Sequence, residues 1–102
     1  MDDKIDVLNV GQPGKVYRAD RAKLAEMRRV MLAVLPAAPA GMTVAALNDA
    51  VRPLLSQALF PGGATCGWWV KCVHLDLEAR GVLSRKAAPV RLWRVEPPPA
   101  PS

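Results

Sequence analysis

The residues best suited to chemistry in this sequence are hydrogen-bond donors and cations in its second half. One predicted helix carries Thr65, Lys71 and His74, whose side chains can donate to base edges or to phosphates. A predicted β-hairpin follows, with four basic residues and no acidic one between them: Arg85, Lys86, Arg91 and Arg94. This pattern predicts a surface that binds phosphate groups, as in nucleic acid.

Each group also has an interpretation without a ligand. On a helical wheel one sector is free of apolar side chains, which is typical of an ordinary solvated face: Gly67, Lys71, His74 and Glu78. Glu78 in that sector would repel phosphate. Basic residues on a hairpin also protect an exposed sheet edge from pairing with another chain. Both interpretations stay open, and for the hairpin we favour contact.

Three other segments invite a functional interpretation. Residues 15–29 carry six basic and two acidic residues, which fits either a phosphate or acidic-protein site or a solvated helix face. The loop Phe60-Pro61-Gly62-Gly63 before a helix is weakly similar to anion-binding loops, and a tight turn explains it better. Of Trp68 and Trp69, at least one belongs in the core, packed under the second hairpin with Trp93. The other could stack on a base or join a dimer contact.

Catalysis and metal binding have little support. His74 is the only histidine, and Cys72 and Asp76 flank it on other faces of the same helix. Cys66, Cys72 and His74 do not converge on one helix, whereas a metal site needs at least three converging ligands. We therefore expect no enzyme activity, no cofactor and no metal.

Length and composition indicate one domain. The chain has 102 residues, 51% of them hydrophobic, and a formal net charge of +5, which favours acidic partners. The acidic start Met1-Asp2-Asp3 does not fit a secretory leader, and no apolar run is long enough for a membrane helix. We expect no membrane partner and a cytoplasmic protein with free, buried thiols.

The elements that position these residues can be predicted in order. Residues 4–19 form a hairpin or arm around the turn Gly11–Gly14. Asp20 caps a helix that ends near Leu35-Pro36 and buries one stripe: Leu24, Met27, Met31 and Val34. Thr43 caps a second helix with the buried stripe Leu47, Val51 and Leu54. At Pro53 this helix either kinks or stops, with a short segment following.

The third helix is bounded by Thr65, a predicted N-cap, and by Gly81, which suits a left-handed C-terminal position. After Gly81 the hydrophobic pattern changes from helical spacing to that of extended strands. Residues 82–86 and 90–95 form two strands around the turn 87–89. Residues 96–102 are a proline-rich tail that we expect to be poorly ordered.

The segment from Leu75 to Arg85 resembles the join between recognition helix and wing in winged helix-turn-helix proteins. There, a Leu-x-x-x-Gly-Leu/Val-Leu/Ile pattern ends the third helix and opens the wing. From Ile5 to about Val95 the chain also resembles a small uncharacterised bacterial family with three shared motifs: Phe60–Gly63, Gly67–Trp69 and Leu75–Ala79.

These resemblances imply an α+β winged helix-turn-helix domain over residues 1–95, with an N-terminal hairpin (4–19), a three-helix core (20–80) and a C-terminal hairpin wing (82–95). The winged helix-turn-helix resemblance implies a small transcriptional regulator, acting as a homodimer, that binds duplex DNA through the third helix and the wing, whereas the family resemblance supports the fold and leaves the function open. The alternative is a protein-interaction or structural module on the same scaffold without DNA binding. Its interface would be the N-terminal hairpin and an exposed tryptophan.

Overall fold

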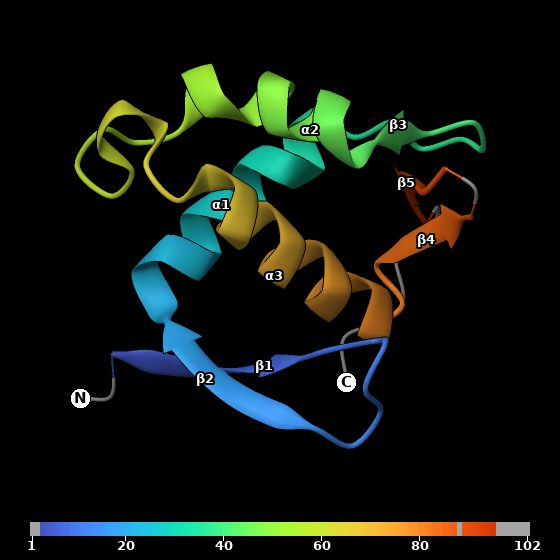
Figure 1. The fold of residues 1–102 in the computed structure, drawn as a ribbon, viewed down its shortest axis with the longest axis horizontal. Coiled ribbons are helices and arrows are strands. Elements are labelled where there is room, and N and C mark those ends of the chain that lie inside the picture. Colours follow the sequence, from blue (N-terminus) through green and yellow to red (C-terminus); the bar gives the residue numbers. More distant parts are fainter. Residues whose placement is uncertain (1–2, 88, 96–102) are drawn as a thin grey trace.

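The computed structural model describes residues 3–87 and 89–95, which form three α-helices and two small antiparallel sheets, an α+β arrangement (Figure 1). In chain order the elements are β1 (Lys4–Leu8), β2 (Val16–Asp20), α1 (Arg21–Val34), β3 (Met42–Thr43), α2 (Val44–Val51), the 3₁₀ turns η1 (Arg52–Leu54) and η2 (Pro61–Gly63), α3 (Cys66–Ala79), β4 (Leu83–Lys86) and β5 (Arg91–Arg94).

The core lies where the three helices meet, because each contributes an apolar stripe. From α1, Met27 and Met31 are fully buried, as are Leu47 of α2 and Val73 and Leu77 of α3. In Figure 1, α3 runs through the middle of the molecule, with α2 on one side and the β1–β2 hairpin on the other. The third helix therefore contacts both the helical core and the hairpin.

Local signals explain where the helices begin and end. Asp20 Oδ1 accepts a hydrogen bond from the Lys23 amide at 3.0 Å, and Thr43 Oγ1 accepts one from the Ala46 amide at 3.1 Å. Both caps satisfy an N–H group that the first helical turn leaves unpaired. Leu35, which precedes Pro36, is extended and ends α1. These three predictions are confirmed.

The predicted N-terminal hairpin is present, with β1 and β2 paired from Lys4↔Asp20 to Leu8↔Val16. Val7 and Ala19 are buried on its inner face. Beyond β1, the Val10 amide donates to the Leu75 carbonyl of α3 at 3.3 Å. The hairpin is thereby attached along α3.

The second sheet has the strand order β3-β5-β4. The hairpin of β4 and β5 was predicted, whereas the two-residue strand β3 was not. Met42 pairs with Leu92 of β5. Gly41, the residue before Met42, has a left-handed backbone at φ 58°. A Cβ at Gly41 would overlap the backbone of Leu92, so the close approach of β3 to β5 requires glycine there.

Two details of the second helix decide between earlier expectations. The α-helix stops at Val51 and Pro53 lies inside the short turn η1, so the interrupted form is confirmed and the kinked form is wrong. Leu54 was expected to be buried but is 55% exposed, because the change to 3₁₀ geometry rotates it outward, and Leu55 is buried instead. The proposed tail at residues 96–102 lies outside the described residues.

Candidate functional site

The outer face of α3 is the narrow part of the helix that neither the core nor the two hairpins cover. Gly67, Trp68 and Lys71 are exposed on it, and Leu75 is half-buried. The side chain of Lys71 has no hydrogen bond or ion pair with any residue in 3–87 or 89–95. A single unpaired cation thus stands at the centre of this face.

His74 and Glu78 do not lie on the exposed face, which corrects the predicted polar strip. His74 is 5% exposed, and its Nδ1 lies 2.7 Å from Glu78 Oε2. The guanidinium of Arg85 in β4 binds both carboxylate oxygens of Glu78, with Nη2 at 3.1 Å from Oε2. The wing strand closes over this part of the strip, so the imidazole is not available to a groove.

Glu78 remains a carboxylate although only 3% of its side chain is exposed. Burial would raise its pKa, but the hydrogen bonds from His74 and Arg85 outweigh burial, so the pKa is lowered from its ordinary value. The same ion pair raises the pKa of Arg85. The negative charge that would repel phosphate is therefore neutralised inside the protein.

Asp76 is the other acidic residue between Thr65 and Val95, and it is also buried, at 2% exposure. Its Oδ1 accepts from the Leu8 amide at 2.9 Å, and Arg80 Nε donates to both its oxygens at 2.9 and 3.0 Å. Arg80 also reaches the Asp6 carbonyl at 3.2 Å. Asp76 thus joins the N-terminal hairpin to α3 and shows no charge at the surface.

The four predicted wing cations separate into two pairs. Arg85 binds Glu78, and Arg94 Nε donates to the Leu35 carbonyl at 2.9 Å, so both have structural partners. Lys86 and Arg91 are exposed and directly opposite each other in the β4–β5 register. Opposed side chains of antiparallel strands stand on the same face, where like charges repel, and an anion between them would relieve that repulsion.

Thr65 was predicted to cap α3, but it does not. Its backbone is left-handed, at φ 60°, and its Oγ1 donates to the neighbouring Ala64 carbonyl at 2.6 Å instead of accepting from the helix. The turn η2 lies just before Thr65 in the chain, so the left-handed residue joins this turn to α3. Thr65 is exposed at the start of α3 and lies one turn before the exposed face.

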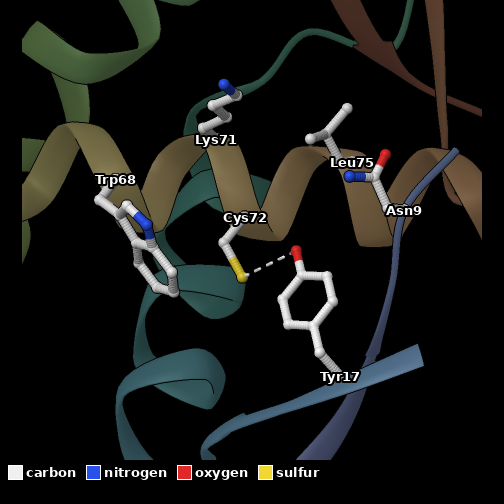
Figure 2. A pocket seen from close by; sticks show the side chains of 6 residues that line it. All are labelled: Asn9, Tyr17, Trp68, Lys71, Cys72 and Leu75. Atoms are coloured by element: carbon white, nitrogen blue, oxygen red, sulfur yellow. Dashed lines mark hydrogen bonds between the residues drawn. The ribbon is translucent and has the colours of Figure 1, made fainter. Parts of the chain in front are cut away.

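A hollow lies between the outer face of α3 and the N-terminal hairpin (Figure 2). Six residues line it: Asn9, Tyr17, Trp68, Lys71, Cys72 and Leu75. At its base the Tyr17 hydroxyl donates to Cys72 Sγ at 3.9 Å, a weak contact. Burial raises the pKa of both groups, so the phenol and the thiol are neutral at physiological pH.

The two adjacent tryptophans have opposite environments. Trp69 is 7% exposed and packs edge-on against Phe60, with ring centroids 6.3 Å apart, whereas Trp68 is 56% exposed. The expectation that one of them belongs in the core is confirmed. The expected packing with Trp93 under the wing is wrong, because Trp69 faces Phe60 at the opposite end of α3.

The other two candidate segments have internal partners. In the 15–29 segment Arg18 pairs with Asp6 at 3.7 Å, and Arg29 pairs with Glu26 at 2.9 Å. At the Phe60–Gly63 loop, the Gly62 amide donates to Gln57 Oε1 and the Gly63 amide to the Phe60 carbonyl, both at 3.0 Å. These amides are used within the turn, which favours the tight-turn interpretation.

No group of three or more metal-ligating side chains occurs among the residues that the structure describes. Cys66 and Cys72 are both free and buried. Within the same described part of the chain, no helix combines the length and the apolar character that crossing a bilayer requires.

Comparison with known proteins gives one match. A family model described as a family of unknown function, DUF6958, matches residues 4–92, which include the first hairpin, all three helices and the second hairpin up to the middle of β5. No curated protein and no solved structure matches the chain. The chain therefore belongs to DUF6958, a family whose function is unknown.

Proposed function

We propose that this protein is a winged-helix domain that binds duplex DNA through α3 and the β4–β5 wing. The order helix, short strand, helix, helix, hairpin supports the fold, as does the sheet order β3-β5-β4. In winged helix-turn-helix proteins the third helix enters the major groove and the wing lies along the backbone. A small regulator that acts as a homodimer fits this assignment.

The observation that carries the proposal is that both acidic residues between Thr65 and Val95 are buried and bound by arginines. Asp76 and Glu78 are both turned inward and bound by Arg80 and Arg85. Arg94 is bound to the Leu35 carbonyl, and the other cations of α3 and the wing are exposed, with no competing anion from this segment: Lys71, Lys86 and Arg91. Such a surface suits a polyanion.

The roles of the site residues follow from their exposure. Lys71, at the centre of the outer face, is the side chain that reaches a base edge or a phosphate in the major groove. Lys86 and Arg91 contact backbone phosphates from the wing, and Thr65 contacts a phosphate near the start of α3. His74, Arg85 and Arg94 hold the wing against the core and act through its position. With one cation on the helix, most of the affinity is independent of sequence.

Fluorescence anisotropy of the full chain with random duplex DNA, at low and at moderate salt, tests this function. We expect binding that weakens steeply with salt, and Lys71→Ala and Arg91→Ala should each lower the slope of log K against log salt by about 1. Arg29→Ala is the control, since it removes an exposed cation from α1, away from α3 and the wing. Absence of binding at low salt would contradict the proposal, and so would two site variants that bind like the wild type.

A second candidate is the protein-interaction module, which the exposure of Trp68 favours. A tryptophan that is 56% exposed beside the half-buried Leu75 is the kind of aromatic anchor that protein interfaces use. Light scattering separates the candidates. A strict monomer without DNA affinity would support a different protein as partner, whereas salt-dependent DNA binding by the wild type would count against this role, which was defined as one without DNA binding.

A further inference from the structure

We propose that Gly67 is the point at which a DNA strand lies directly against the backbone of α3, and that its missing side chain sets how closely the helix approaches the DNA. This role rests on the proposed DNA binding, of which it names the closest contact. The cations of α3 and the wing supply the attraction, whereas Gly67 supplies room.

The fold itself does not require glycine at position 67. The other six glycines of the chain lie outside the α-helices and strands, and five of those six have left-handed backbones. Gly67 lies within α3 and has no positive φ. Outside its own turn of helix, a Cβ at Gly67 would have no atom of residues 3–87 or 89–95 within 4 Å. Neither backbone conformation nor internal packing therefore explains this glycine.

Glycine at this position weakens α3. It is a poor helix former, because its backbone loses more freedom on folding than that of any other residue. Gly67 is exposed, so a larger side chain would fit there without a clash inside the protein. What glycine does provide is a stretch of helix backbone that another molecule can approach closely. The loss of helix stability is explained if a ligand lies against the helix at this point.

Gly67 lies on the side of α3 that carries Lys71, because residues four apart on a helix are neighbours on one face. Figure 2 shows the Lys71 side chain directed away from Trp68 and Tyr17, so this side is not the side of the hollow. The exposed indole therefore stands apart from the ammonium group. A polyanion drawn to Lys71 would meet the bare backbone of Gly67 one turn earlier.

The same side of α3 continues to the wing. His74 and Glu78 follow at helical spacing with buried side chains, and Arg85 of β4 binds Glu78, with Nη2 at 3.1 Å from Oε2. The wing continues from Arg85 with its two exposed, opposed cations. A DNA strand that contacts both the wing and α3 would cross the part of this side that the wing leaves open, which begins at Gly67.

Fluorescence anisotropy of the full chain with random duplex DNA tests the role of Gly67. Gly67→Ala should weaken binding about tenfold, because a methyl group in a close contact forces a shift, and Gly67→Leu should weaken it further. Neither variant removes a cation, so the slope of log K against log salt should change less than in Lys71→Ala. Ala25→Leu adds bulk to the exposed side of α1 and, as the control, should bind like the wild type.

Urea denaturation separates this role from a structural one. Gly67→Ala should raise the unfolding midpoint, because alanine is the better helix former, so stability and DNA affinity should change in opposite directions. The role is overturned if the wild type binds DNA and Gly67→Leu binds equally well. It is also overturned if Gly67→Ala lowers the midpoint, since the fold would then need glycine there. Absence of wild-type binding at low salt would overturn the proposed function itself, and this role with it.

Discussion

Two hairpins flank α3, and one buried carboxylate of that helix holds each of them. Asp76 holds the N-terminal hairpin by accepting from the Leu8 amide, a backbone donor. Glu78, half a turn later, holds the wing by accepting from Arg85, a side-chain donor, and also contacts His74. Two buried carboxylates of the same helix thus hold the two hairpins differently: Asp76 binds a backbone amide of its hairpin, and Glu78 binds a side chain of the wing.

The difference lies in what remains when either carboxylate is removed. Without Asp76, the Leu8 amide and the guanidinium of Arg80 lose their common acceptor, and the Val10 amide still donates to the Leu75 carbonyl, over a longer 3.3 Å. Without Glu78, the wing is still paired with β3, and the Arg94 amide still donates to the Pro36 carbonyl at 2.8 Å. The N-terminal hairpin should therefore depend more on its carboxylate than the wing does.

Asp76→Ala should have the largest effect. It leaves a part-buried backbone donor and Arg80 without their acceptor, and we expect unfolding to become easier by about 3 kcal/mol. Urea denaturation measures the loss. Asp49→Ala, which removes an acid from an exposed pair with Arg52, is the control and should cost less than about 0.5 kcal/mol. Equal losses in the two variants would refute the assigned role.

Glu78→Gln should have a smaller effect, about 1 to 2 kcal/mol, because Gln keeps the shape and the wing keeps its strand pairing. Amide hydrogen exchange locates the change. Protection should fall in β4 and β5 and persist in β1 and β2, while Asp76→Asn should give the opposite pattern. If both variants loosen the same hairpin, the two attachments are not independent.

The smallest effect concerns pH. The pKa of Glu78 is lowered in the folded protein, so the stability from this carboxylate is complete above its ordinary pKa of 4.5 and is lost as pH falls through the folded value. The stability difference between wild type and Glu78→Gln should thus stay constant above this ordinary pKa and shrink as pH falls below it. Urea titrations at several pH values check this. A constant difference would show that Glu78 is not charged in the fold.

The elements with local signals could be predicted from the sequence. Asp20 and Thr43 cap helices, Gly11–Gly14 turns the first hairpin, and Gly81, at φ 76°, ends the third helix. In each case the reason lies within a few residues of the chain. The strand β3 has no such signal, because two residues become a strand only when β5 pairs with them.

The site was predicted less well, because exposure depends on tertiary contacts. The helical wheel placed Lys71, His74 and Glu78 in one polar sector, and that grouping is geometrically sound. It could not show that Arg85, from the next strand, binds Glu78, or that His74 is buried against Glu78. The hollow was missed because it joins Tyr17 of the hairpin to Trp68 of α3, residues far apart in sequence.

The way α3 occupies the outer edge of β1 also bears on self-association. The Asp6 carbonyl and the amides of Leu8 and Val10 point away from β2, and all three are bound by Arg80, Asp76 and the Leu75 carbonyl. Fibril growth by strand addition requires an available edge on both sides of a sheet. Copies can add to this sheet only beside β2, so such addition stops at a closed pair of molecules and does not propagate.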